Sequence, residues 1–203
     1  MEYYDIVLFS PPSRMINHYR PPVGLLYLGG YLLHMGLRVK IIDVPLKEQI
    51  RNKEFFDNVE NVIEDVYQEM LNEFRRIKTK LVGISCYTPE YFEVVRLAKA
   101  IKEADPLLKI VVGGVHPTLY PQDFFDEENG VDICVCGEGE VTLYELCKNI
   151  LNNSNENLIL GGIKGIVYRD DRLKKIMHTP PRPASDNLDD ISFPAHSLID
   201  MQY

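Results

Sequence analysis

The chain has 203 residues and carries 22 Lys and Arg against 30 Asp and Glu, so its formal net charge at pH 7 is -8. Its length is roughly 1.4 times that of an average domain, which predicts one domain with an appendage. So acidic a chain, with no basic run longer than Arg75-Arg76 or Lys174-Lys175, argues against nucleic-acid binding. A hydrophobic fraction of 45% excludes wholesale disorder.

Cysteines and apolar runs bear on the compartment of the protein. The cysteines are too few, in a chain this long, for a secreted disulfide framework, and they lack the second C-x2-C pair of a zinc site. We expect buried, reduced thiols at all four positions: Cys86, Cys134, Cys136 and Cys147. The most apolar stretch, 23–35, is interrupted by glycines and is shorter than the roughly 20 residues of a membrane span. With a charged N-terminus unlike a signal peptide, this predicts a cytoplasmic protein with no membrane partner.

The first part of the chain predicts two strands and two helices. Strands are expected over 5–9 and 38–42, where short apolar runs end at turn residues. Helices are expected over 23–35 and 48–80, where apolar residues recur every three or four positions. Bases that suit the helix dipole gather at the end of the longer helix: Arg75, Arg76, Lys78 and Lys80. We interpret this helix as an outer, solvated element, with a partner-binding face as the alternative.

The alternation continues along the chain. Further strands are predicted over 81–85, 109–112 and 132–135, with helices over 90–104 and 140–151 and a short helical turn near 119–128. The strands are nearly continuous in apolar character and each is followed by a helix. This pattern is typical of a parallel sheet covered on both faces.

The C-terminal part of the chain has a different composition. Strand-like segments at 165–169 and 173–177 flank a short polar turn, which predicts a β-hairpin. Prolines then follow in a polar stretch: Pro180, Pro181, Pro183 and Pro194. This composition is typical of a linker and not of a core.

The loops after the strands form the predicted site, because ligands of an open parallel sheet bind outside the carboxyl ends of its strands. Gly113-Gly114 follows the fourth strand, and Gly137-Glu138-Gly139 follows the fifth. Glycines at such ends allow another group to approach the backbone, and the helix that follows offers free N–H groups. The alternative is that these glycines only form tight turns.

Other residues at the same edge complete the predicted site. Ser85 and Thr88 offer hydroxyls, Tyr87 can stack on a planar ligand, and His116 is the one histidine in the predicted cleft. The cofactor-binding candidates are Pro11, Ser85, Tyr87, Thr88, Gly113, Gly114, His116, Gly137, Glu138 and Gly139. No metal ligand is predicted because the histidines are scattered, and no catalytic residue because Glu138 and Glu140 have no second catalytic group beside them.

Familiar nucleotide-binding patterns are absent. The loop Ser10-Pro11-Pro12-Ser13 lacks the glycines of G-x-G-x-x-G, and no G-x-x-x-x-G-K-[ST] occurs anywhere. Ser85 stands where a phosphoacceptor receiver domain requires an aspartate. The prolines after the first strand remove donors that the phosphate loop of a flavodoxin needs.

Four motifs, however, resemble one family. They are Pro-Pro-x-Gly-Leu-Leu-Tyr-Leu at 21–28, Val-Gly-Ile-Ser-x-x-Thr at 82–88, Val-Val-Gly-Gly-Val-His-Pro-Thr at 111–118 and Gly-Glu-Gly-Glu-x-Thr-Leu at 137–143. The chain resembles the N-terminal cobalamin-binding domain of class B radical S-adenosylmethionine enzymes, in particular the magnesium-protoporphyrin IX monomethyl ester oxidative cyclase type. The match covers nearly the whole chain, and residues 179–183 and 188–195 resemble the segment that leads into the radical domain.

The resemblance implies a cofactor. Ser85 and Gly113-Gly114 stand where this fold lines the pocket for the nucleotide tail of cobalamin. The D-x-H-x-x-G motif, whose histidine ligates cobalt, is missing after the first strand, so base-off cobalamin without a protein histidine is expected. The C-x3-C-x2-C motif is also missing, so S-adenosylmethionine and the 4Fe-4S cluster are expected only in a missing domain. This chain by itself is not expected to cleave S-adenosylmethionine.

We therefore predict a flavodoxin-like α/β domain over 1–160, with a five-stranded parallel sheet of order 2-1-3-4-5 and helices on both faces, followed by a hairpin and linker over 161–203. Its expected function is to bind cobalamin at the carboxyl edge and to present it to a radical domain of the same polypeptide. There a small-molecule substrate would undergo methyl transfer or oxidative cyclisation. The alternative is a degenerate domain that binds no cobalamin and serves substrate recognition or domain docking.

Overall fold

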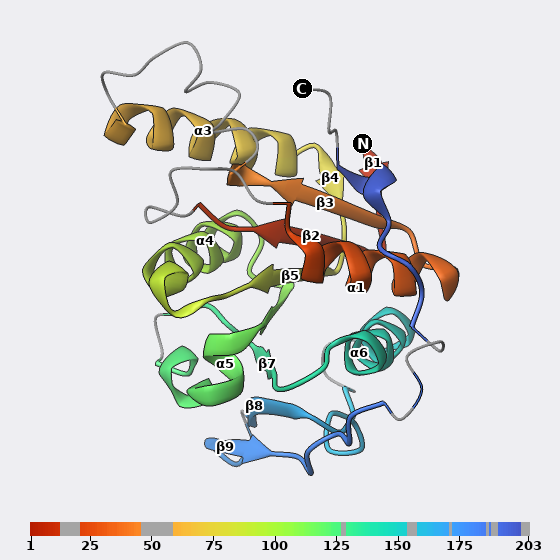
Figure 1. The fold of residues 1–203 in the computed structure, drawn as a ribbon. Coiled ribbons are helices and arrows are strands. Elements are labelled where there is room, and N and C mark those ends of the chain that lie inside the picture. The colour runs from red at the N-terminus through yellow and green to blue at the C-terminus, as the bar shows by residue number, and fades with distance from the viewer. Residues whose placement is uncertain are drawn as a thin grey trace.

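The computed structural model describes residues 1–12, 21–45, 59–126, 129–153, 158–170, 172–185, 187 and 191–199 (Figure 1). Its centre is one sheet with the strand order β3-β2-β5-β6-β7-β8-β9. The strands are β2 Ile6–Ser10, β3 Val39–Asp43, β5 Leu81–Ser85, β6 Lys109–Gly113, β7 Ile133–Val135, β8 Ile166–Asp170 and β9 Lys175–His178. Neighbours from β3 to β7 pair in parallel, and numbered along the chain these five stand in the order 2-1-3-4-5.

Helices cover both faces of this sheet (Figure 1). The helices α1 (Val23–His34) and α6 (Glu140–Asn152) pack on one face, and α3 (Val59–Phe74) and α4 (Tyr91–Ala104) pack on the other. Alternation along the strands explains both layers, because successive side chains point to opposite faces. In β2, Val7 and Phe9 contact the layer of α3 and α4, whereas Ile6 and Leu8 contact the layer of α1 and α6.

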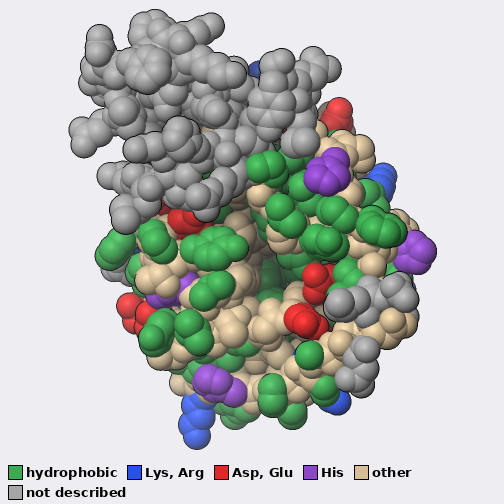
Figure 2. All heavy atoms as spheres, in the orientation of Figure 1, with side chains coloured by type: hydrophobic (Ala, Val, Ile, Leu, Met, Phe, Trp, Pro, Cys, Tyr) green, Lys and Arg blue, Asp and Glu red, His purple; other side chains and the backbone are tan. Residues whose placement is uncertain are grey.

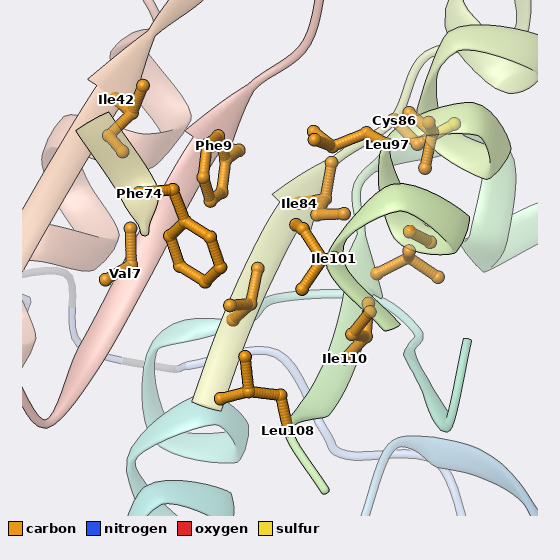
Figure 3. Packing of buried hydrophobic residues seen from close by; sticks show 14 of the residues in the cluster. Val7, Phe9, Ile42, Phe74, Ile84, Cys86, Leu97, Ile101, Leu108 and Ile110 are labelled. Carbon is orange, nitrogen blue, oxygen red and sulfur yellow. The ribbon is translucent and has the colours of Figure 1, made fainter. Parts of the chain in front are cut away.

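Figure 3 shows part of the larger of the two cores, between the sheet and the α3 and α4 layer. The rings of Phe9 and Phe74 meet edge to face with their centroids 5.6 Å apart, which joins β2 to the end of α3. Ile84 of β5 and Ile101 of α4 are buried in the same cluster. Burying a side chain of this size stabilises the fold by about 1.5–3 kcal/mol.

The predicted helix over 48–80 is wrong at its C-terminal end, while residues 46–58 lie outside the described residues. The helix α3 ends at Phe74, so its last turn contains no base. The apolar repeat stops there, and Ile77–Lys78 forms β4, which pairs in parallel with β1 (Glu2–Tyr3). The backbone N–H of Tyr4 also donates to the Lys78 carbonyl at 3.0 Å. The backbone of residues 77–78 therefore forms its hydrogen bonds with residues 2–4, which are distant in sequence. Pairing of this kind produces no local periodicity from which it could be predicted.

The helical turn expected near 119–128 begins earlier than predicted. Two short helices lie here, α5 (Val115–Leu119) and the 3-10 helix η2 (Pro121–Phe124). Pro121 has no backbone N–H, so it cannot continue the hydrogen bonding of α5, and a separate helix begins at this residue. This earlier start brings His116 and Thr118 into a helix that directly follows β6.

The predicted hairpin is present but does not stand apart from the sheet. Strand β8 pairs antiparallel with β7, and β9 pairs with β8, so the hairpin extends the main sheet at one edge. Its turn includes Lys174, whose φ is 52°. The hairpin therefore lies directly beside the last parallel strand and close to the loop that follows it.

The proline-rich segment after the hairpin packs on the domain instead of running free as a linker. The backbone N–H of Ala195 donates to the Leu26 carbonyl of α1 at 3.0 Å, and Ile199 is buried. Two glycines of α1 allow this approach: a Cβ on Gly30 would lie 2.2 Å from the Phe193 oxygen, and one on Gly29 would lie 2.5 Å from Leu198 Cδ1. None of the described helices combines the length and apolar character needed to cross a membrane.

Candidate functional site

The carboxyl ends of the parallel strands share one edge of the sheet, and every predicted site residue lies at this edge. These residues follow β2 (Pro11), β5 (Ser85, Tyr87, Thr88), β6 (Gly113, Gly114, His116) and β7 (Gly137, Glu138, Gly139). The strand order reverses at β2, which has β3 on one side and β5 on the other. Open α/β sheets bind ligands at such a reversal. Here the Ser85 hydroxyl lies 3.5 Å from the Phe9 carbonyl oxygen, while Pro11 is buried.

Figure 2 shows a hollow in this part of the surface, near the end of β5 and between α1, α5 and α6, bordered by hydrophobic side chains and, on one side, by acidic ones. Exposed apolar residues at the same edge include Tyr87, Phe92, Val115, Leu119 and Tyr120. Tyr87 is 58% exposed and Phe92 is 80% exposed, which is unusual for aromatic side chains of their size. Clustered exposure of this kind is typical of a surface that receives a ligand or another domain.

Backbone contacts hold the loop after β5 (the third loop) against the loop after β6 (the fourth loop), and the loop after β7 is called the fifth loop. The Cys86 N–H donates to the Gly113 carbonyl at 2.8 Å, and the His116 N–H donates to the Cys86 carbonyl at 3.2 Å. Gly114 makes this approach feasible, because its φ is +110° and a Cβ there would lie 2.8 Å from the Cys86 oxygen. Only glycine adopts this conformation without strain. Gly114 therefore supports the packing of the two loops as well as any approach of a ligand.

Thr118 connects the fourth loop to the fifth, although it is not among the predicted site residues. Its hydroxyl donates to the Gly114 carbonyl at 2.7 Å and accepts from the Gly137 N–H at 3.0 Å. One side chain thus sets the spacing between the two glycine-containing loops. The only sequence signal is its place at the end of the Val-Val-Gly-Gly-Val-His-Pro-Thr motif.

His116 lies beneath the loops and does not face the hollow as an exposed group. Its side chain is 7% exposed, with Nδ1 3.2 Å from the Thr88 hydroxyl and Nε2 3.3 Å from Asp123 Oδ2. The second contact has the distance of an ion pair without hydrogen-bond geometry. The rings of Tyr91, Tyr120 and Phe124 surround the imidazole at centroid distances of 5.1 to 5.6 Å. His116 therefore links the third loop to η2.

Gly137 is the most open point of the fifth loop. Its φ is +86°, and a Cβ built on it would meet no atom within 4 Å. Gly139 is the N-cap of α6, so the first N–H groups of that 13-residue helix face the same edge. Gly113, one strand away, would have only Val135 near a Cβ, at 3.8 Å. Open glycines beside a helix N-terminus suit the polar tail of a large cofactor, because backbone donors lie within reach and no side chain obstructs them.

Glu138, the remaining residue of this loop, is held by the segment that follows the hairpin. Its carboxylate accepts from the Ser185 backbone N–H at 3.1 Å. Arg182 of the same segment donates from Nε to the Thr142 hydroxyl at 2.7 Å and also bonds the Glu145 carboxylate. Arg182 is not among the predicted site residues, because the surrounding prolines and polar residues predicted a linker.

The four cysteines are free, and the prediction of buried thiols is confirmed for three of them but not for Cys136. Cys86, Cys134 and Cys147 are buried, and Cys136 is half-buried. Burial raises the pKa of Cys86 and of Cys147 to about 12, and it also raises the pKa of Cys134 and Cys136. Protonated thiols in such surroundings are poor nucleophiles and poor metal ligands.

Comparisons with known proteins agree with this geometry. The chain is 30% identical to an uncharacterized methyltransferase of Pyrococcus horikoshii, over 99% of this chain and 40% of that protein. It is 32% identical to the anaerobic magnesium-protoporphyrin IX monomethyl ester cyclase of Synechocystis, over 91% of this chain and 34% of that protein. The chain thus spans well under half the length of these relatives.

A solved structure and a family model complete the comparison. The radical S-adenosylmethionine methyltransferase TsrM of Kitasatospora setae, solved with cobalamin and a 4Fe-4S cluster, matches 98% of this chain and 32% of its own, with a TM-score of 0.65 and 21% identity. At that identity the match shows a common fold. The family model described as the B12 binding domain matches residues 15–147. This range covers more than half of the sequence and contains the loops after β5, β6 and β7, and the chain belongs to the B12-binding domain family.

Proposed function

We propose that this chain holds cobalamin at the carboxyl edge of its sheet as the N-terminal domain of a radical S-adenosylmethionine enzyme. The observation that carries the proposal is the open glycine Gly137 beside the N-terminus of α6, in a domain of the B12-binding family. Gly113 and Ser85 extend this surface across the neighbouring strand ends. These residues would hold the tail of the cofactor, and the bound cofactor would supply its cobalt chemistry.

The rest of the catalytic apparatus would belong to a further domain of the same polypeptide. The curated relatives are longer than this chain, and they include a cyclase and a methyltransferase. Both names are compatible with the reactions inferred from the motifs, methyl transfer or oxidative cyclisation of a small molecule. We place S-adenosylmethionine and the 4Fe-4S cluster in that further domain.

The state of the bound cofactor follows from His116. Because Thr88 and Asp123 flank its imidazole and three aromatic rings enclose it, we infer that His116 does not coordinate the cobalt. Cobalamin would then bind base-off with no imidazole ligand from the described residues. Residues 13–20, which contain His18, lie outside the described residues.

The test compares two glycines with similar positive φ angles, +86° at Gly137 and +83° at Gly36. Gly137→Ala adds a methyl group at the proposed contact, whereas Gly36→Ala adds one at φ +83°, also in open space, just after α1. Both variants bear similar backbone strain, so a difference in hydroxocobalamin affinity reports the contact itself. We expect Gly137→Ala to weaken binding about tenfold, or about 1.4 kcal/mol, and Gly36→Ala to bind like the wild type.

Titration calorimetry and the absorbance of desalted samples measure this affinity. Equal affinities for the two variants would show that Gly137 lies outside the contact. If the wild type retains no cobalamin, the proposal fails and the docking role replaces it. Electron paramagnetic resonance of the reduced complex should show no nitrogen splitting, and a splitting that disappears in His116→Ala would contradict the base-off assignment.

A further inference from the structure

The segment after the hairpin reaches the same loop that forms the proposed cofactor site. We call residues 179–185 the proximal tail. The Ser185 N–H donates to Glu138, and Arg182 bonds Thr142 and Glu145 in the first two turns of α6. Glu138 and α6 both follow β7 directly. The proximal tail, which is not part of the five parallel strands or their helices, thus contacts the fifth loop and the helix that follows it.

Two backbone hydrogen bonds connect the proximal tail, through Gly165, to the start of the fifth loop. The Gly165 N–H donates to the Pro180 carbonyl at 2.9 Å, and the Cys136 N–H donates to the Gly165 carbonyl at 2.8 Å. Gly165 has φ +76°, and a Cβ there would lie 3.2 Å from the Cys136 oxygen and 3.4 Å from Arg182 Cβ. Three segments of the chain therefore meet here with little space for a further side chain.

Arg182 is the charged centre of this junction. Its side chain is 17% exposed, although the tail around it is mostly exposed. It donates to a hydroxyl and to a carboxylate at once, and charge-assisted bonds of this kind are stronger than neutral ones. Holding an arginine side chain in one conformation costs entropy, which the hydrogen bonds to Thr142 and Glu145 must outweigh. Two such bonds to one face of α6 therefore indicate a specific attachment of the tail.

We propose that Arg182 is a positioning residue of the cofactor site: by attaching the proximal tail to α6 and Glu138, it holds the fifth loop in the conformation that receives cobalamin. The inference rests on the proposed function. The attachment also couples the site to the position of the proximal tail, so a displacement of the tail would change the affinity for cobalamin.

The test compares Arg182→Ala with a matched loss of charge, Arg169→Ala. Arg169 lies on β8 and lines a polar pocket with Lys109 and Asp132, away from the contacts of the proximal tail. We expect Arg182→Ala to weaken hydroxocobalamin binding about tenfold and Arg169→Ala to leave it unchanged. Arg182→Lys keeps the charge but loses the planar fork, so its affinity should fall between the two.

Hydrogen exchange of the cofactor-free chain gives a readout that does not depend on cobalamin. The Cys136, Gly137 and Leu143 amides bond to Gly165, Thr118 and Gly139 respectively, and all three should exchange faster in Arg182→Ala only. If the wild type binds no cobalamin, the proposed function fails, and faster exchange in Arg182→Ala still supports the role of Arg182 in holding the fifth loop. Unchanged exchange of these three amides, or equal cobalamin affinity of the wild type and Arg182→Ala, would overturn the positioning role of Arg182. Should Arg182→Ala unfold, the same comparisons are made with Arg182→Lys.

Discussion

Thr118 shows how much a single hydroxyl does at this edge of the sheet. It is both donor to Gly114 and acceptor from Gly137, at 2.7 and 3.0 Å. Glycine loops have many accessible conformations, because no Cβ restricts them. A side chain that bonds two of them removes much of that freedom before a ligand binds, and preorganisation of this kind raises affinity without a new contact.

Replacing Thr118 by valine removes both hydrogen bonds at almost constant volume. We expect Thr118→Val to lower the free energy of unfolding by about 1 kcal/mol, since the residue is exposed and water replaces part of the lost bonding. Thr118→Ser keeps the hydroxyl and is the control. Urea denaturation measures the difference, and a Thr118→Val chain as stable as Thr118→Ser would show that the bridge contributes nothing.

At the scale of elements, α1 combines a buried apolar face with a surface that the tail contacts. Leu26 and Leu32 are buried against the sheet, and Gly29 and Gly30 are buried beneath residues 191–199. Glycine inside a helix normally destabilises it by about 1 kcal/mol relative to alanine. Two such residues in one helix are explained here by the close approach of the Phe193 backbone and the Leu198 side chain.

Gly30→Ala should detach this part of the tail, because the new methyl group would lie 2.2 Å from the Phe193 oxygen. Hydrogen exchange of the Ala195 amide, which bonds to Leu26, should become faster. The control is Gly24→Ala, which adds a methyl to the same helix with no atom within 4 Å. It should leave the exchange at Ala195 unchanged, and equal exchange in the two variants would contradict tail docking through Gly30.

At the scale of the whole molecule, the sheet separates two apolar layers, and each layer buries protonated thiols. Cys86 and Cys134 lie in the layer of α3 and α4, and Cys147 lies in the layer of α1 and α6. Desolvation disfavours the thiolate, so burial raises the pKa of Cys86 and of Cys147 to about 12. In the unfolded chain these thiols ionise near pH 8.5.

The sign of the pH dependence follows from this difference. Below about pH 8.5 both states are protonated and the thiols do not affect stability; above it the unfolded state releases protons that the folded state retains. Stability should therefore fall between about pH 9 and pH 12, by up to about 1.4 kcal/mol per pH unit for each thiol. Urea denaturation at about pH 8 and pH 10.5 measures the fall, which should be shallower in Cys147→Ala. An equal slope in the two chains would contradict the assignment.

Local patterns predicted the parallel strands and most of the helices. The strand over 81–85 matches β5 (Leu81–Ser85), and the helix over 140–151 matches α6 to within one residue. Both succeed because buried strands are continuous in apolar residues and amphipathic helices repeat with their own period. The same patterns placed the glycine loops at one edge, since the carboxyl ends of parallel strands always meet there.

The sequence by itself therefore determined the layers, the edge that carries the proposed site and the family motifs. Only the tertiary structure decided that Thr118 joins two loops, that His116 lies buried between Thr88 and Asp123, and that Arg182 attaches the tail to α6. Periodicity records which face of an element is buried, because that preference repeats along the chain. A hydrogen bond between residues 40 positions apart, such as Arg182 to Thr142, leaves no repeat and depends on where the whole fold places its two ends.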